Sequence, residues 1–360
     1  MARFGKRADV TVHEASPFNA ESSRAALAEA PLTAVDAFYV RNHGAVPDVD
    51  PAAWRLRVTG LVERELELSL DELRDGRFAP REEVVTLQCA GNRRAALAEV
   101  REIPGEAPWG PGATGTARWG GVSLAGVLAA AGVRAGAAHV GFAGADRSHE
   151  VEPPECFGGS VPLAKALGAE VLLAWEMDGS PLARVHGAPL RVVVPGWVGA
   201  RSVKWLERIE VREQPWDGYY QAISYRLLAP DQSPGRGIGQ SLGELAVVAD
   251  VLAPGEGDTV AAGAVAVRGY AFAGGNRVVF RVDVSADAGA TWTRAELLDD
   301  LGRWAWRPWR ATLELAPGEH VLIARAWDSA TGVQPEDPAT LWNPKGYMNT
   351  AQARVRISAR

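Results

Sequence analysis

A cysteine followed by two arginines is the segment of this sequence best suited to chemistry. Residues 84–87 form a short apolar run that leads to Cys89, and Gly91 allows a sharp turn before Arg93 and Arg94. Cations near a thiol lower its pKa and favour the thiolate, which is a nucleophile and a soft metal ligand. A lone cysteine is more often a buried, inert side chain. The two arginines disfavour full apolar burial, so the segment favours thiolate chemistry.

Three further segments gather cations and hydrogen-bond donors. Residues 38–47 place an arginine, an amide and an imidazole in succession, and residues 341–349 form an aromatic, basic tail. Taken alone, residues 38–47 are better interpreted as a polar loop, and residues 341–349 are also typical of a packed terminus. In residues 186–205 an apolar strand has cations at both ends and glycines that let backbone amides approach a ligand. This pattern predicts an anion cradle, and the spacing of a nucleotide-binding P-loop is absent.

Composition and charge exclude several classes of protein. The net charge of -6 gives the chain no general attraction for nucleic acid or for anionic membranes, so we expect neither as a partner. Two cysteines are too few for a disulfide framework or a structural zinc site, and no Cys-x-x-Cys-His segment is present to attach haem. Residues 1–23 lack the apolar run of a signal peptide, and no stretch approaches the roughly 18 apolar residues of a membrane span. We therefore expect a cytoplasmic protein, or a periplasmic one if an export signal has been removed from the sequence.

The elements that must position these segments indicate two domains. Residues 1–34 are interpreted as an N-terminal extension, and residues 35–235 mix strands with short helices, which predicts an α+β domain built on a mixed sheet. Residues 236–360 carry about seven short strand patterns separated by turn residues, which predicts an all-β immunoglobulin-like sandwich. Residues 214–240 are interpreted as a long connection between the two domains.

Over residues 35–358 the four segments together resemble the sulfite oxidase family of molybdenum enzymes. The resemblance implies a domain that binds one molybdopterin per chain, followed by an immunoglobulin-like domain through which two chains form a homodimer. It also implies that the thiolate of Cys89 is the protein ligand of the molybdenum. The chain carries no haem-binding segment, so the resemblance implies that electrons pass to an external acceptor, for example a cytochrome.

The resemblance and the anion cradle together give two sets of candidate residues. The residues predicted to hold the cofactor, besides Cys89, are Asn42, His43, Asp146, Ser148, His186, Arg191, Arg201, Ser202 and Lys204. By sequence alone, the segment of Asp146 and Ser148 is only a turn. The residues predicted to form the substrate pocket are Arg41, Arg94, Trp109, Tyr225 and Lys345.

The implied activity is oxidation of a small oxyanion, sulfite, to sulfate. Three departures from the family pattern put the substrate in question: Lys345 stands where the vertebrate and plant enzymes have arginine, Ser224 replaces an acidic residue, and Pro104 lies at or near the position of a pocket lysine. Reduction of nitrate or of a sulfoxide at the same metal is therefore an alternative. Two alternatives from other classes are a Cys–His hydrolase with Cys89 as its nucleophile and a non-enzymatic binding protein.

Overall fold

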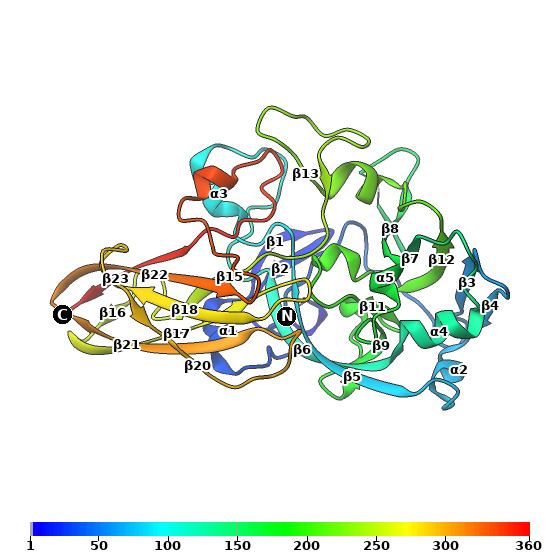
Figure 1. Ribbon diagram of the computed structural model, residues 1–360, viewed down its shortest axis with the longest axis horizontal. Helices are drawn as coiled ribbons and strands as arrows, with labels where there is room; N and C mark the ends of the chain where they lie inside the picture. Colours follow the sequence, from blue (N-terminus) through cyan, green and yellow to red (C-terminus); the bar gives the residue numbers. More distant parts are fainter. Residues whose placement is uncertain (1–2, 149) are drawn as a thin grey trace.

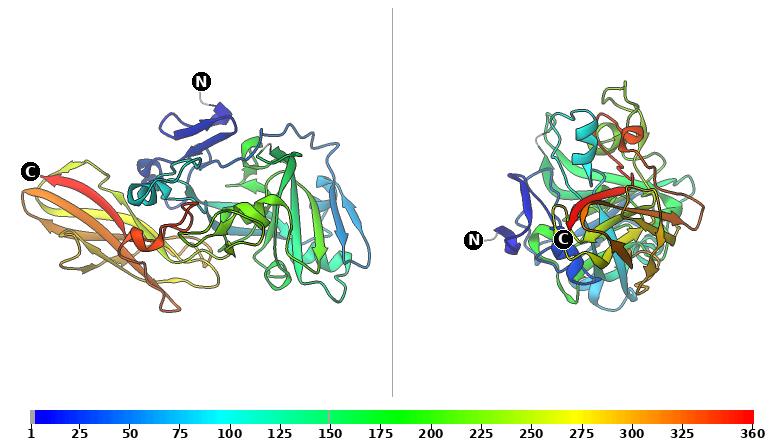
Figure 2. Two further views of the ribbon diagram at one scale, coloured as in Figure 1. Left: turned by 90° about the horizontal axis from the view of Figure 1, so that it is seen from above. Right: turned by 90° about the vertical axis from the view of Figure 1, so that its left-hand side faces the viewer.

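Two β-rich domains follow one another along the long axis of the molecule, and the C-terminus lies at the far end of the second domain (Figure 1). This computed structural model describes residues 3–148 and 150–360. An N-terminal segment lies beside the junction of the two domains (Figure 2). Among the residues described, no helix has the length and apolar character needed to cross a bilayer.

Two five-stranded sheets form the framework of the first domain. One has the order β10-β9-β6-β5, with β11 paired to β9, and the other has the order β4-β3-β12-β7-β8. The strands are β3 (Leu56–Gly60), β4 (Leu66–Leu68), β5 (Pro80–Gln88), β6 (Thr114–Ser123), β7 (His139–Ser148), β8 (Glu155–Pro162), β9 (Leu172–Met177), β10 (Ser180–Pro181), β11 (Arg191–Val193) and β12 (Leu206–Arg212). Strand β12 is parallel to β3 and antiparallel to β7, so the predicted mixed sheet is confirmed.

Short helices connect these strands and begin or end at residues with clear local causes. They are α1 (Arg24–Glu29), α2 (Leu70–Arg74), α3 (Arg94–Val100), α4 (Leu124–Ala131) and α5 (Leu163–Ala166). Helix α2 begins with a capping box, in which Ser69 and Glu72 satisfy each other's backbone amides. Helix α4 ends at Gly132, whose φ of 74° suits a glycine.

The N-terminal residues pack closely against both domains. Strands β1 (Thr11–Ala15) and β2 (Phe18–Glu21) form a hairpin, and Ala20 in β2 forms a β-bridge with Val40 of the first domain. Helix α1 contacts strand β15 (Val248–Ala253) of the second domain. This extension is therefore part of the packed structure.

The connection between the domains is irregular but well packed. It contains a single π-helical stretch at Tyr220–Ser224 and the short pair β13 (Arg226–Leu227) and β14 (Gln240–Ser241). Tyr220 and Tyr225 are buried, as expected for aromatic side chains that are costly to leave in water. The connection therefore brings a tyrosine into the interior of the first domain.

The second domain is a two-sheet β-sandwich, and the predicted all-β architecture is confirmed. One sheet has the order β15-β17-β21-β20, and the other has the order β16-β23-β22-β18-β19. The strands are β15 (Val248–Ala253), β16 (Thr259–Val260), β17 (Gly263–Phe272), β18 (Val279–Ser285), β19 (Thr293–Arg294), β20 (Glu296–Leu297), β21 (Arg307–Leu315), β22 (Gly318–Asp328) and β23 (Ala353–Ala359). Side chains along β21 alternate between buried and exposed, because one face of the strand covers the apolar core.

A buried carboxylate joins the two domains at the loop that carries Cys89. Asp250 in β15 is fully buried, and its oxygens lie 2.9 Å from the guanidinium of Arg24 and 3.8 Å from that of Arg93. Arg93 also donates a 2.7 Å hydrogen bond to the carbonyl of Ala351. The second domain thereby holds the loop after Cys89 in place.

Candidate active site

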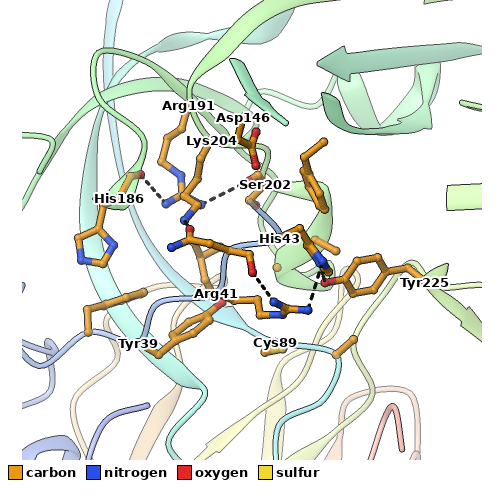
Figure 3. Close-up of a pocket in the computed structure, with 17 residues that line it drawn as sticks. Tyr39, Arg41, His43, Cys89, Asp146, His186, Arg191, Ser202, Lys204 and Tyr225 are labelled. Atoms are coloured by element: carbon orange, nitrogen blue, oxygen red, sulfur yellow. Dashed lines mark hydrogen bonds between the residues drawn. The ribbon is translucent and has the colours of Figure 1, made fainter. Parts of the chain in front are cut away.

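A cavity lies at the end of strand β5, where distant segments of the chain converge (Figure 3). The apolar part of its wall comes from Phe38, Leu87 and Phe157. The predicted site residues that line it are Arg41, Asn42, His43, Cys89, Asp146, His186, Arg191, Ser202, Lys204 and Tyr225. The fold thus gathers most of the sequence-predicted polar residues into one space.

Cys89 follows directly from a strand that ends inside the domain. Strand β5 pairs with β6 from Pro80 to Gln88, so the chain reaches the cavity as a buried strand and turns there. The side chain of Cys89 is 7% exposed, and its sulfur accepts a 3.4 Å hydrogen bond from the amide of Gly91. The sulfur therefore lies in the cavity wall with an amide donor already directed at it.

Burial changes the pKa of this thiol more than the charges of the neighbouring arginines do. It raises the pKa of Cys89, although the charges of Arg94 and Arg41 act to lower it. The expectation that two adjacent arginines would favour the thiolate is therefore wrong for the protein without a metal. One of the two, Arg93, points away from the thiol and donates a hydrogen bond to the carbonyl of Ala351. A bound metal cation reverses this balance, because a coordinated thiol is deprotonated outright.

Positive side chains form the wall of the cavity away from Cys89 (Figure 3). Arg191 is 5% exposed and donates to the carbonyls of His186, at 2.9 Å, and Ser202, at 3.0 Å. Its Nε atom is buried and has no partner among the residues that the structure describes. Burial lowers the pKa of Arg191 to about 10 and that of Lys204 well below its usual value.

The cavity contains too little negative charge to balance these cations. Asp146 is the only carboxylate among the described lining residues, and burial raises its pKa to about 6 while Lys204 opposes the shift. Leaving buried charge without a partner costs several kcal/mol, on the order of 3–5 when one member of a pair is missing. The site is therefore built to receive an anion, and the phosphate of a pterin cofactor fits this requirement.

Lys6 is a residue of this site that the sequence interpretation missed. Its ammonium group lies 2.7 Å from Nε2 of His186 and donates to the carbonyls of Val35 and Phe38, at 2.5 and 2.8 Å. The residue is 3% exposed, and burial lowers its pKa to about 7 against the opposing charge of Asp36. It supports the cation wall through His186, from the N-terminal extension.

The lowered pKa of Lys6 makes stability depend on pH. From about pH 7 to pH 9 the folded protein binds fewer protons at Lys6 than the unfolded chain, whose lysines titrate near ~10.4, so stability rises with pH. We expect the cofactor-free wild type to gain about 2 kcal/mol of unfolding free energy over this window relative to Lys6→Met. Denaturant unfolding of both proteins at the two pH values measures this difference. Parallel pH profiles would contradict the role of Lys6 as a buried titrating group.

A chain of hydrogen bonds links the cavity to solvent. Nε2 of His43 lies 2.7 Å from the hydroxyl of Tyr225, and Nδ1 lies 2.7 Å from a carboxylate oxygen of Glu150. Burial lowers the pKa of His43 to about 4, so its ring is neutral near pH 7. Nδ1 lies 3.2 Å from Nη2 of Arg41, which can only donate, but the carboxylate of Glu150 is closer and can only accept, so we assign the proton to Nδ1, and Nε2 accepts from Tyr225. The side chain of Glu150 is 40% exposed, so this chain of hydrogen bonds ends at solvent.

The histidines near the cavity do not form a hydrolase dyad with Cys89. Both ring nitrogens of His43 have other partners, and Nε2 of His186 lies against Lys6. Among the hydrogen bonds of residues 3–148 and 150–360, the sulfur of Cys89 takes part only in the one from the amide of Gly91. The arrangement gives the thiol no general base, so the hydrolase alternative lacks its catalytic pair.

Five predicted residues lie outside the cavity lining, for different reasons. Ser148 is fully buried beside it, and its hydroxyl accepts from the amide of Glu150 at 3.1 Å. Trp109 is fully buried in the apolar cluster that contains Cys89. Arg94 and Lys345 lie close to one another and share a carboxylate partner, Glu106.

Arg201 is not brought into the cavity. Its guanidinium donates to the hydroxyl of Ser241 at 3.1 Å and to the carbonyl of Leu242 at 2.8 Å. The residue ends a short 3-10 turn, so its side chain projects to the opposite side from that of Ser202. Of the residues expected to form the anion cradle, the structure therefore brings Ser202 and Lys204 to the cavity but not this arginine.

The two domains match two family models. Residues 43–220 match the oxidoreductase molybdopterin binding domain, and residues 240–360 match the Mo-co oxidoreductase dimerisation domain. The solved structure of the sulfane dehydrogenase SoxCD from Paracoccus pantotrophus covers 95% of this chain with a TM-score of 0.82 and 25% identity, over 84% of its own length. Fold and site define a molybdopterin-dependent oxidoreductase.

Similarity to two known proteins over most of the chain establishes its family. The chain is 44% identical to the sulfite oxidase of Gallus gallus over 95% of its length, and 42% identical to the mitochondrial sulfite oxidase of Rattus norvegicus over 96%. It spans 76% of the chicken protein and 65% of the rat protein. The chain belongs to the sulfite oxidase family.

Proposed function

We propose that this chain oxidises sulfite to sulfate at a molybdenum centre and passes the electrons to an external acceptor. The observation that carries the proposal is the surplus of cationic side chains over carboxylates in the described lining of the cavity that Cys89 borders, where Arg41, Arg191 and Lys204 face Asp146. When bound, the molybdenum cofactor supplies the oxygen atom that is transferred to sulfur and takes up two electrons. Identities of 44% and 42% to enzymes named sulfite oxidase support sulfite as the substrate.

The residues that would hold the cofactor lie on two sides of the cavity. Cys89 would provide the thiolate ligand of the metal. Arg191, Lys204 and His186 would bind the phosphate of the pterin, and the partnerless Nε of Arg191 is a donor available for it. Asn42, which accepts a hydrogen bond from Lys204, would orient that lysine toward the same group.

Arg41 is the cation best placed to orient the substrate. It lines the cavity together with Cys89, and its Nη2 lies 3.2 Å from Nδ1 of His43. Burial acts to lower the pKa of Arg41, but the nearby Tyr225, Cys89 and Glu150 act to raise it, and the pKa lies above its usual value. Its fixed positive charge would hold an oxyanion with the sulfur lone pair toward the metal.

The hydrogen-bond chain supplies a route for protons. Oxidation of sulfite with oxygen from water releases two protons along with two electrons. The hydroxyl of Tyr225 donates to Nε2 of His43, and Nδ1–H of His43 donates to Glu150. A proton accepted at Nε2 can therefore leave through Nδ1 to Glu150 and reach solvent. Burial raises the pKa of Tyr225 well above its usual range, so the phenol stays neutral while the proton passes.

Two assays on purified protein test the proposal directly. Elemental analysis should find molybdenum at about one atom per chain, and sulfite should reduce an added dye. The competing activity, reduction of nitrate or a sulfoxide, is measured with a reduced dye as electron donor. Molybdenum with nitrate reduction and no sulfite oxidation would replace the proposed reaction with the alternative. A protein without molybdenum after expression in a cofactor-producing host would overturn it.

Removing the charge of Arg94 should weaken substrate binding. Its guanidinium is held by the carbonyls of Lys345, at 2.9 Å, and Ala107, at 2.8 Å. We expect Arg94→Gln to raise KM for sulfite about tenfold, which corresponds to ~1.4 kcal/mol, with a smaller change in kcat. Arg101→Gln, at an exposed arginine after the same helix, is the control and should leave KM unchanged. An unaltered KM in the Arg94 variant would remove this arginine from the substrate pocket.

The second domain is expected to pair two copies of the chain. Its match to a dimerisation domain supports a homodimer, and Phe280 on β18 is 72% exposed, which is unusual for an aromatic side chain in water. Sedimentation of the purified protein gives the oligomeric state.

The external electron acceptor would be a separate redox protein, for example a cytochrome. Mixing the enzyme and sulfite with candidate cytochromes, and measuring whether each cytochrome is reduced, tests this.

A further inference from the structure

Two of the cations predicted to bind substrate are already paired with a carboxylate of this chain. Nη2 of Arg94 lies 3.3 Å from Oε2 of Glu106, and the ammonium of Lys345 is hydrogen-bonded to Oε1 of the same residue. The side chains of Arg94, Lys345 and Glu106 are 4%, 18% and 15% exposed. One carboxylate therefore takes the place that an oxyanion would occupy between these two cations.

The remaining donors of Arg94 are committed to the backbone. Its Nε donates to the carbonyl of Lys345 and its Nη1 donates to the carbonyl of Ala107, which fixes the plane of the guanidinium. The Nη2 group is the part of the guanidinium left for a charged partner, and Glu106 holds it. A ligand that is to bind Arg94 through Nη2 must displace Glu106.

This ion-pair cluster lies next to the reacting groups. A side chain at Gly91 would meet Nη2 of Arg94 at 2.6 Å, so the guanidinium packs against the loop that carries Cys89. Cζ of Arg94 lies 5.2 Å from the ring centre of Tyr347, which stacks on Tyr225 at 5.5 Å.

We propose that Glu106 is a specificity-determining residue that competes with the anionic substrate for Arg94 and Lys345. This inference rests on the proposed oxidation of an oxyanion at this site. In the free enzyme Glu106 neutralises part of the positive charge of the pocket. An oxyanion binds only if its interaction with the two cations exceeds that of the carboxylate, so weakly held anions are rejected. Because Glu106 is partly exposed, its carboxylate can turn to solvent when substrate displaces it.

Substitution by glutamine removes the competing charge and keeps the shape of the side chain. We expect Glu106→Gln to bind sulfate, an anion that does not react further, about tenfold more tightly than the wild type. KM for sulfite should fall by a similar factor, with kcat within about twofold of the wild type. The Glu106→Ala variant should shift both constants in the same direction, because it also frees both cations.

The matched control is an ion pair of the same kind and burial elsewhere in the domain. Lys165 and Glu170 lie 2.6 Å apart with side chains 13% and 18% exposed. Glu170→Gln should leave sulfate binding unchanged. Calorimetric titration of sulfate into the molybdenum-loaded wild type, Glu106→Gln, Glu106→Ala and Glu170→Gln measures the four affinities without any turnover.

The outcomes separate this inference from the proposed function. Tighter sulfate binding in both Glu106 variants, with none in the control, supports the competition. Unchanged or weaker sulfate binding in both Glu106 variants, at equal molybdenum content and equal circular dichroism, overturns it. If the variants bind sulfate more tightly while the wild type does not oxidise sulfite, the competition stands and the proposed reaction fails.

Discussion

Replacing Cys89 with serine is expected to abolish nearly all sulfite turnover while leaving the fold intact. The side chain is small and 7% exposed, and serine can keep the hydrogen bond that the amide of Gly91 donates to Sγ. A hydroxyl is a much poorer anionic ligand than a thiol, because it stays protonated where a coordinated thiol ionises. We expect kcat to fall at least about 1000-fold, which corresponds to roughly 4 kcal/mol of transition-state stabilisation.

The second cysteine of the chain provides the matched control. Cys156 in β8 is only partly buried, and it lies opposite Arg147 of β7. Cys156→Ser should retain wild-type turnover. Cofactor content, measured as molybdenum and as released pterin, should fall little in the Cys89 variant, because the phosphate-binding cations are unchanged. Wild-type activity in Cys89→Ser, at equal cofactor content, would show that the thiolate of Cys89 is not a required ligand of the metal.

Features that depend on neighbours in the sequence were predictable. The Ser69–Glu72 capping box and the glycine end of α4 are local, and the sequence shows both residues of each signal. The apolar run before Cys89 correctly indicates a buried strand, although the strand extends further, from Pro80 to Gln88. Short-range patterns were enough to place the thiol at the end of a strand.

The segment of Asp146 and Ser148 shows where local patterns fail. The sequence suggests a turn, but both residues belong to strand β7, which is held by its pairing with β8. Hydrogen bonds to a partner strand override the weak local preference of Asp and Ser for turns. A single sequence does not reveal that partner, and only the resemblance pointed to this segment; the structure places Asp146 in the cavity lining and Ser148 outside it.

Lys6 and Glu106 could not be found from sequence for a different reason. Lys6 meets His186 across 180 positions, and Glu106 meets Lys345 across 239. Neither lies in a motif, and each is one charged residue among many others. Their contacts come entirely from tertiary packing, which places Lys6 beside His186 and Glu106 between Arg94 and Lys345.

The positive charge of Lys204 in the cavity wall is only partly balanced by a carboxylate. Lys204 is half-buried, burial lowers its pKa well below its usual value, and Asp146 only partly offsets the cost. Methionine has a similar volume and no charge. Replacing buried charges with apolar side chains of similar size is often neutral or stabilising by about 1–4 kcal/mol when no ion pair is broken, and burial already raises the pKa of the neighbouring Asp146 to about 6. The protein without cofactor should therefore become more stable in Lys204→Met.

The same change should have the opposite effect on cofactor binding. Lys204 would contribute its charge to the phosphate of the pterin, so we expect the molybdenum content of purified Lys204→Met to fall about tenfold or more, while the melting temperature of the cofactor-free protein rises by about 2–4 °C. Lys165→Met, which breaks a pair with Glu170, should not raise the melting temperature and should leave molybdenum content unchanged. A cation that binds the cofactor is expected to destabilise the empty site and to stabilise the filled one. If Lys204→Met is instead less stable and keeps its full cofactor content, this lysine is a structural residue.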